Sequence, residues 1–290
     1  MLTLAATVEG SGRLVSFGSE PLYRWHTRGL FDELADALLW AAGTPATTAD
    51  LGAPYTAPRD PDPQPDPQPD PGTPARTPQD TAAPRDVDDS CPPGRVPALR
   101  FPDVPAGDVH QRTIRCVDWW QVARGFDDGT YRPLGTVTRG QMASFVARTV
   151  VAGGGTLPSQ PGDAFSDDDG TTHELAVNQL AAVGIVLGRE DRTYGPDQPV
   201  TRAQMASFLV RAYRYVAGVD LPRGGPYFLD TVGVTQREDI DRAAAVGLTG
   251  GREDGRYEPF DPTLRGQMAT FLSRLLDLFV EDGSAELPTR

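Results

Sequence analysis

The chain of 290 residues has few cysteines, few histidines and no excess of basic residues. Its two cysteines and three histidines do not cluster with the spacing of metal ligands, so we predict no metal site and no cofactor. Lys and Arg together number 27 against 40 Asp and Glu, which gives a formal net charge of −13. This charge argues against a nucleic-acid partner, because that binding depends on basic side chains that neutralise phosphates.

Long apolar runs are missing as well. No stretch approaches the ~20 apolar residues of a membrane-spanning helix, so we expect no membrane insertion. The first residues, MLTLAATVEGSG, lack the basic start and the apolar core of a signal peptide.

The chain does contain a threefold internal repeat. The three copies read TRGQMASFVAR at residues 138–148, TRAQMASFLVR at 201–211 and LRGQMATFLSR at 264–274, with a constant period of 205 − 142 = 63 between their methionines. A fixed period of this length indicates repeated structural units, and one such unit is too small to bury a core alone. The three repeats must therefore pack together.

Each copy predicts the start of a helix. The first two copies have a capping box, in which a threonine and a glutamine three positions later satisfy each other's backbone N–H groups. In the third copy Leu264 stands at the cap position, so either Thr263 caps one residue early or the cap is weaker. The capping pairs are Thr138 with Gln141 and Thr201 with Gln204, and the second copy continues as an apolar stripe of Met205, Phe208, Leu209 and Ala212.

Upstream of each capped helix the repeats share a second helix and a turn. Each repeat opens with Phe-x-Asp, continues with a short amphipathic helix, and reaches a turn with aligned Gly, Tyr and Pro. The opening motifs are 101–103, 165–167 and 228–230, and the turns are 125–133, 188–196 and 251–259. We predict a mainly α fold of three helix-turn-helix repeats, at residues 99–152, 163–216 and 226–281.

The pattern F-x-D-V, helix, G-[FY]-x-D-G-x-[FY]-x-P, V-T-R-[AG]-[EQ]-M-A-x-F resembles the S-layer homology (SLH) domain, over about 180 residues. The resemblance implies a monomeric bundle with internal pseudo-threefold symmetry and grooves between its repeats. It also implies non-catalytic binding of cell-wall polysaccharide, often carrying pyruvate ketals, and an extracellular place at the bacterial cell wall.

The resemblance assigns ligand contacts to the arginine that follows the cap in each copy. A cation in the first helical turn opposes the helix dipole, so either an external anion or a neighbouring aspartate is expected beside it. An anionic ketal carboxylate suits a bidentate guanidinium. The arginines are Arg139, Arg202 and Arg265; because Leu264 weakens the third cap, we expect Arg265 to be the least well oriented.

Further ligand contacts are predicted at three other sets of positions. Glutamine replaces the family's glutamate beside each arginine, the aspartate of Phe-x-Asp either contacts the arginine or sugar hydroxyls or caps a turn, and one of two adjacent tryptophans could stack on sugar. These residues are Gln141, Gln204 and Gln267; Asp103, Asp167 and Asp230; and Trp119 and Trp120.

The histidines before two helices, His110 and His173, are expected to have capping or surface roles. The Asp-rich turns, such as 167–169, lack the ligand spacing of an EF-hand, which disfavours calcium.

The part before the repeats divides into a linker and an N-terminal remnant. Residues 44–98 alternate Pro with polar residues and predict a disordered spacer. Cys91, in that spacer, is predicted to form a disulfide with Cys116 in an oxidising environment; the alternative is two inert thiols, with Cys116 in the core.

Residues 1–43 predict a strand at 14–17 and a helix at 27–41, and they resemble the C-terminal end of a glutamine-amidotransferase-like domain of secreted hydrolases. If so, the chain is the tail of a longer protein, which would explain the missing signal peptide. Two alternatives to a pure anchor therefore stay open: the C-terminal part of a secreted hydrolase, and a module that forms a lattice or binds a protein partner.

Overall fold

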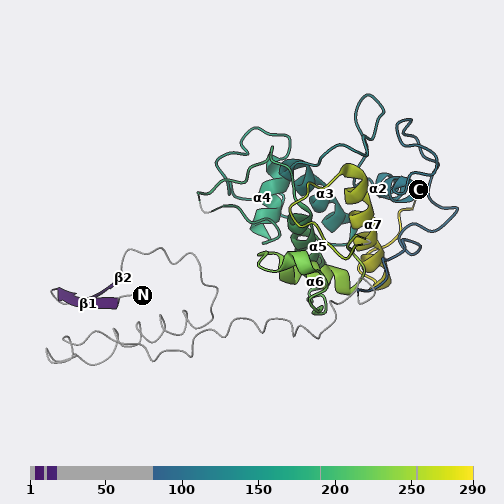
Figure 1. The fold of residues 1–290 in the computed structure, drawn as a ribbon. Coiled ribbons are helices and arrows are strands. Elements are labelled where there is room, and N and C mark those ends of the chain that lie inside the picture. The colour runs from purple at the N-terminus through teal and green to yellow at the C-terminus, as the bar shows by residue number, and fades with distance from the viewer. Residues whose placement is uncertain (1–3, 10–11, 18–80, 190, 253, 290) are drawn as a thin grey trace, which may run out of the picture. The chain divides into compact units, whose positions relative to one another are not determined.

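A computed structural model describes residues 4–9, 12–17, 81–189, 191–252 and 254–289 (Figure 1). The chain divides into two compact units, Met1–Thr73 and Pro74–Arg290. Within the described residues, no helix combines the length and the apolar composition that crossing a bilayer requires.

The first unit contains an antiparallel hairpin. Strands β1 (Leu4–Glu9) and β2 (Gly12–Phe17) pair with Leu4 opposite Phe17. The predicted strand at residues 14–17 is thereby confirmed as part of β2. The predicted helix at 27–41 lies outside the described residues, so the assignment of residues 1–43 to an α/β remnant stays a prediction.

The second unit is built from helices in pairs, which confirms the predicted mainly α fold. Each repeat contributes one short and one long helix, in that order (Figure 1). The short helices are α2 (Gln111–Trp119), α4 (Glu174–Ala182) and α6 (Arg237–Ala245), with a 3-10 turn η3 (Leu229–Thr231) before α6; the long helices are α3 (Arg139–Ala152), α5 (Arg202–Ala217) and α7 (Arg265–Glu281).

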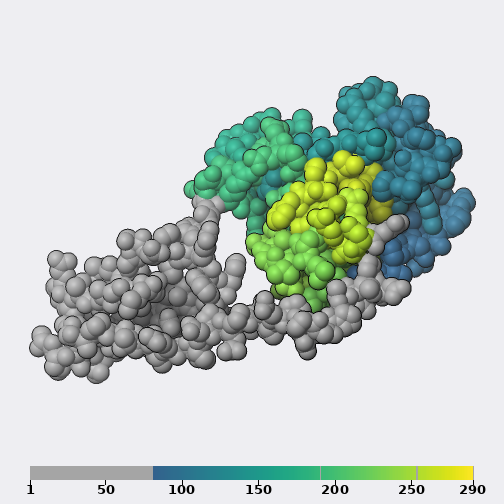
Figure 2. All heavy atoms as spheres, viewed as in Figure 1, coloured from purple at the N-terminus to yellow at the C-terminus, as the bar shows by residue number. Residues whose placement is uncertain are grey.

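Each short helix packs against a long helix of another repeat. The three long helices α3, α5 and α7 contact one another, and each short helix packs against the long helix of the preceding repeat: α4 on α3, and α6 on α5. The first short helix, α2, has no preceding repeat and packs on α7 of the last one. In Figure 2 the yellow C-terminal residues accordingly lie beside the blue start of the same unit. The packing therefore closes into a ring.

Backbone hydrogen bonds join the repeats in the same cyclic order. The segment before each long helix pairs with its counterparts in the other two repeats, as Val137 N donates to Thr263 O, Val200 N to Val137 O and Thr263 N to Val200 O, over 2.9–3.0 Å. Each repeat thus supplies one donor and one acceptor to a central junction. The long helices all begin at this junction, which brings their first turns together.

The caps of the long helices follow the sequence. Thr138 and Thr201 accept the N3 backbone N–H at 3.3 and 3.2 Å. At α7 Leu264 provides no side-chain cap, and Thr263 does not replace it, because its buried hydroxyl has no hydrogen-bond partner among the described residues. Of the two predicted alternatives, an early cap by Thr263 and a weaker cap, the third repeat has the weaker cap.

The folded unit begins earlier than the predicted linker boundary at residue 98. Residues 81–98, which we name the strap, lie against α2 and α7 through a disulfide between Cys91 and Cys116 and a hydrogen bond from Ser90 N to Asp277 Oδ1 at 2.9 Å. Val87 and Cys91 are buried in the same core as the helices. The proline-rich composition does not predict these contacts, because they join residues that are far apart in the sequence.

Candidate binding site at the repeat junctions

Each predicted ligand arginine lies at the junction of its own repeat with the next. The guanidinium Nε of Arg139 donates to Tyr194 O at 2.8 Å, that of Arg202 to Tyr257 O at 2.9 Å, and that of Arg265 to Tyr131 O at 2.8 Å. The third contact runs from the last repeat back to the first. One geometry is therefore built three times around the ring.

The tyrosine of each junction holds its arginine from two further directions. Its hydroxyl donates to the arginine's own backbone carbonyl, at 2.9 Å from Tyr194 to Arg139. Its ring lies under the same guanidinium, 4.4 Å from the carbon centre, as in a cation–π contact. Tyr257 and Tyr131 repeat both contacts with Arg202 and Arg265. The three tyrosines align in the sequence without pointing to a role, and their presence in every copy was the only signal of one.

The three arginines are buried charges with no counter-ion among the described residues. They are only 4–8% exposed, and no carboxylate of the described part of the chain forms an ion pair with any of them. Burial lowers the pKa of Arg139 and of Arg265 from the ordinary arginine value. Asp167 and Asp103 oppose these shifts only in part and form no ion pair with the arginines. A buried cation that has a carbonyl and a ring as partners but no counter-ion is still unfavourable, which makes an anion from outside the chain the alternative to test.

In the described part of the chain, the first two backbone N–H groups of each long helix beside the arginines are bonded to the next repeat, and only α7, which lacks a side-chain cap, has no cap on its third. At α3, Arg139 N donates to Gln198 O and Gly140 N to Pro196 O, both at 2.8 Å, and the N3 amide is used by the cap. The other two long helices use the loops of the next repeat in the same way. The terminal nitrogens of the guanidinium groups are therefore the main donors left at these junctions.

The aspartates of the Phe-x-Asp motifs cap turns. Asp167 accepts backbone N–H groups from Tyr194 at 2.6 Å and Gly195 at 2.8 Å. Asp103 and Asp230 do the same for residues 131–132 and 257–258. Of the predicted roles, the structure shows turn capping. Each aspartate thereby holds in place the tyrosine carbonyl that an arginine contacts, and so positions the arginine indirectly.

The three glutamines belong to the helix caps. Gln141, Gln204 and Gln267 are half-buried, and each side-chain oxygen accepts the backbone N–H of the cap residue at 3.1–3.3 Å. Replacement of the family's glutamate by glutamine keeps this geometry and leaves each arginine without an adjacent carboxylate.

The adjacent tryptophans are both in the core, which differs from the predicted sugar-stacking wall. Trp119 and Trp120 are 4% and 7% exposed and meet edge to face. Trp120 Nε1 donates to Ser90 O of the strap at 2.9 Å. Two indoles about 100° apart on a helix can both be buried here because the strap covers a second side of α2.

The histidines bridge neighbouring repeats without capping a helix. His173 Nδ1 lies 2.9 Å from Ser144 Oγ on α3, and His110 Nδ1 lies 2.8 Å from Thr270 Oγ1 on α7. Each ring presses on a glycine of that long helix, Gly140 or Gly266, where an added Cβ would meet the ring within 2.8 Å. This contact explains why glycine follows the motif arginine in repeats one and three. In repeat two the residue after the arginine is Ala203, and the next repeat has Gln236 in place of the histidine.

Arg265 is as well placed as the other two arginines, although its helix lacks a side-chain cap. In addition to Tyr131, its guanidinium lies 4.6 Å from the Phe126 ring and 5.4 Å from the Phe145 ring. The expected loss of orientation is therefore absent. Tertiary contacts hold this side chain where the cap does not.

Arg202 differs from the other two in its terminal nitrogens. Its Nη2 donates to Gly250 O at 3.0 Å, whereas the structure gives no such bond to Arg139 or Arg265 within the described residues. The Arg202 guanidinium therefore has one fewer donor for a ligand. None of the three arginines lines the cavity of about 280 Å³ found in repeat three, between residues 223–224 and α6.

The match to known families coincides with these repeats. The S-layer homology domain matches residues 121–143, 164–206 and 227–269. Each matched segment contains one motif arginine and one of the turns that contact the arginines. Each of the three repeats of this chain thus matches the S-layer homology domain. The matches do not test the resemblance of residues 1–43.

The relatives that this chain resembles include proteins named as surface proteins and as enzymes. The chain is 27% identical over 172 residues to cell surface glycoprotein 1 of Acetivibrio thermocellus and 28% identical over 159 residues to an endoglucanase of Bacillus sp.. It is 27% identical over 177 residues to an S-layer protein of Bacillus licheniformis. The alignments cover 57%, 54% and 60% of this chain but only 7%, 16% and 19% of the relatives.

Proposed function

We propose that the SLH unit anchors the protein non-covalently to an anionic polysaccharide of a bacterial cell wall, outside the cell, and that it catalyses no reaction. The observation that carries this proposal is the ring of three buried arginines without counter-ions in the described residues. Relatives named as surface and S-layer proteins support the location.

The ligand we propose is a polymer with carboxylates, such as pyruvate ketals on its sugars. A guanidinium held at Nε by a carbonyl keeps its terminal N–H groups in one plane, which suits a carboxylate. A charge-assisted hydrogen bond of this kind contributes roughly 1.5–3 kcal/mol, so each junction adds about a 10- to 100-fold gain in affinity. Three junctions on one polymer add avidity without new contacts.

The experiment is co-sedimentation of the full chain with protein-free cell walls, before and after mild acid removes the ketals. We expect binding to native walls and loss of binding to acid-treated walls. Failure to bind native walls at low and moderate salt would refute the anchor, and unchanged binding after acid would refute the ketal. Circular dichroism is the check that each variant below is folded.

Arginine variants test the mechanism. We expect Arg139→Ala and Arg265→Ala each to weaken wall binding about tenfold or more, and Arg202→Ala to weaken it less, because Gly250 already occupies one of its donors. The triple variant should not bind. Arg223→Gln, whose side chain is 82% exposed, is the matched control and should bind normally. Binding by a folded triple variant would exclude the arginine mechanism.

Two broader roles concern the whole protein and not the repeats alone. Because some relatives are enzymes, including the endoglucanase, a longer protein with this anchor could be a secreted hydrolase. Release of reducing sugar from wall polymer by this chain would show that the repeats themselves are catalytic. Ordered self-assembly of the chain in light scattering would instead favour a lattice-forming module.

A further inference from the structure

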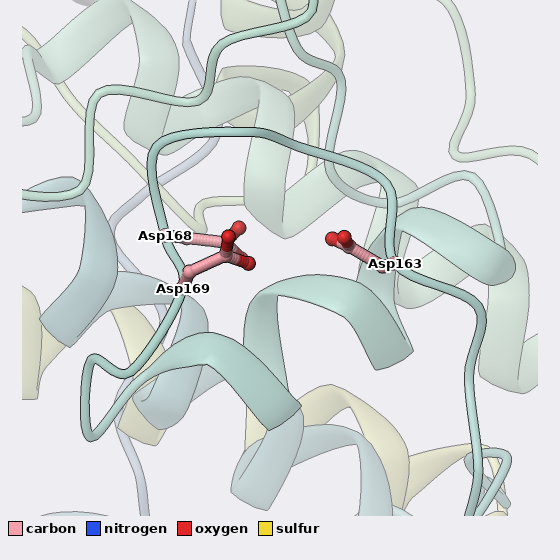
Figure 3. A group of neighbouring side chains, drawn as sticks. All are labelled: Asp163, Asp168 and Asp169. Atoms are coloured by element: carbon pink, nitrogen blue, oxygen red, sulfur yellow. The ribbon is translucent and has the colours of Figure 1, made fainter.

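The loop that opens repeat two brings together three aspartates, one of which is buried. Oxygens of Asp163, Asp168 and Asp169 all lie within 4.8 Å of one another. Figure 3 shows the Asp168 and Asp169 carboxylates together and the Asp163 carboxylate facing them from the other side of the loop. Asp163 and Asp169 are exposed, whereas Asp168 is fully buried.

The buried aspartate has no partner that would account for its place in the core. Neither carboxylate oxygen of Asp168 receives a hydrogen bond from another of the described residues, and no ion pair in that part of the chain involves any of the three aspartates. A buried carboxylate with neither hydrogen bonds nor a cation is strongly disfavoured. Here two more carboxylates stand beside it.

The other two repeats show what this position requires when it has no special role. Repeat one has Val104 and repeat three has Thr231 at the place of Asp168, and both are buried. The Thr231 hydroxyl donates to Phe228 O at 2.9 Å, so its polar atom is satisfied. The flanking aspartates are also absent, since Leu99 and Pro105 replace them in repeat one and Pro226 and Val232 in repeat three. The acidic group is therefore a feature of repeat two alone and not of the shared fold.

We propose that Asp163, Asp168 and Asp169 bind a divalent cation, with calcium preferred. Carboxylate oxygens are the ligands that calcium takes in proteins, and its flexible coordination suits an irregular loop better than the strict octahedron of magnesium. The two exposed aspartates leave the site open to solvent, so water can complete the shell. Thr171, three residues after Asp168, has a buried hydroxyl oxygen without a partner in the described chain and is a candidate fourth ligand.

The site would act on the junction between repeats one and two. Asp167, next to Asp168, holds the backbone of Tyr194, whose carbonyl accepts from Arg139. A cation that fixes residues 163–169 therefore stabilises the turn that positions Arg139. The sequence disfavours calcium at this turn because the spacing is not that of an EF-hand. The site proposed here is of another kind, since its ligands come from both ends of a short loop.

The test is thermal unfolding and calorimetric titration of the full chain, first stripped with a chelator, against CaCl₂ at constant ionic strength. Calcium sites of extracellular modules bind at about 0.1–1 mM, so 10 mM calcium should raise the melting temperature by roughly 3–10 °C. Magnesium at the same concentration should raise it less.

Variants separate a specific site from screening of the negative charge. Asp168→Val, the residue of repeat one, should abolish the calcium shift and melt above the wild type in calcium-free buffer. Asp169→Asn should weaken calcium binding several-fold. Asp127→Asn, an exposed acidic residue of repeat one, should keep the full shift.

Two outcomes would overturn the proposal. If wild type shows neither heat nor a shift with 10 mM calcium, Asp168 is held as a buried neutral acid and the cluster binds no calcium. If Asp168→Val and Asp169→Asn keep the wild-type shift, calcium acts through the overall charge and not at this loop.

Discussion

At the scale of single residues, the two histidines of the helical unit make it sensitive to acid. Burial lowers the pKa of His110 and of His173 below the ordinary value of about 6.5, and a nearby arginine (Arg274 and Arg148, respectively) lowers each further. Asp108 and Asp197 oppose these shifts only in part. The folded state therefore favours neutral histidine.

This shift has a definite sign for stability. The contribution of each histidine is complete above the unfolded pKa near 6.5 and is lost as the pH falls through the lower folded pKa. The double variant His110→Gln/His173→Gln carries the residue that repeat three has at this position, Gln236. We expect its melting temperature to fall less than that of wild type between pH 7.5 and 5.0. Parallel thermal melts of the two proteins check this. Equal losses would mean that groups other than the two histidines set the acid response.

At the scale of elements, the strap and α2 form one unit through the disulfide. Cys91 and Cys116 are 25 residues apart in sequence with Cα atoms 5.7 Å apart, and both side chains are buried. The strap is also held by ion pairs from Arg85 to Asp277 at 3.5 Å and to Glu281. The strap is therefore held against the first and last helices of the ring, α2 and α7.

Removing the disulfide should destabilise the unit without changing its fold. A crosslink across 25 residues contributes about 3 kcal/mol in chain-entropy models, so Cys91→Ala/Cys116→Ala should melt roughly 6–12 °C below wild type. Limited proteolysis should then cut within residues 81–98 first. An unchanged melting temperature would show that the ion pairs and Ser90 hold the strap by themselves. Melting of the variant with and without reductant is the control.

At the scale of the whole molecule, stability depends on closing the ring. The first short helix, α2, has α7 as its long-helix partner, and Tyr131 accepts from Arg265 across 134 residues of sequence. A chain without its third repeat would expose the faces of α2 and α5 that contact α7 and α6. Loss of one repeat should therefore affect all three.

We expect a chain that ends at Gly218 to show no cooperative thermal transition in circular dichroism, because no two-repeat fragment buries a closed core. A chain that begins at Pro74 is the matched control, since it lacks only the other compact unit and should melt at the wild-type temperature. A cooperative transition in the two-repeat chain would show that the repeats fold independently and that the ring is not required.

The sequence by itself determined the local structure of the repeats. The 63-residue period, the threonine–glutamine caps and the Gly-Tyr-Pro turns are short-range signals, and each long helix begins at the position they predict. The motif arginines were also recognisable, because a repeated cation in a first helical turn works against its own helix. The aspartate at position 168 could have been found by aligning it with Val104 and Thr231.

Only the tertiary structure decided how the repeats meet and what their polar residues do. That each arginine contacts the next repeat's tyrosine carbonyl, that the aspartates cap turns, that both tryptophans are buried, and that residues 81–98 belong to the core depend on contacts between distant parts of the chain. Periodicity describes which face of a helix is apolar but not which partner covers it. Once the ring closes, burial removes the arginines and Asp168 from water, and this loss of solvation makes an external anion and a cation the ligands to test.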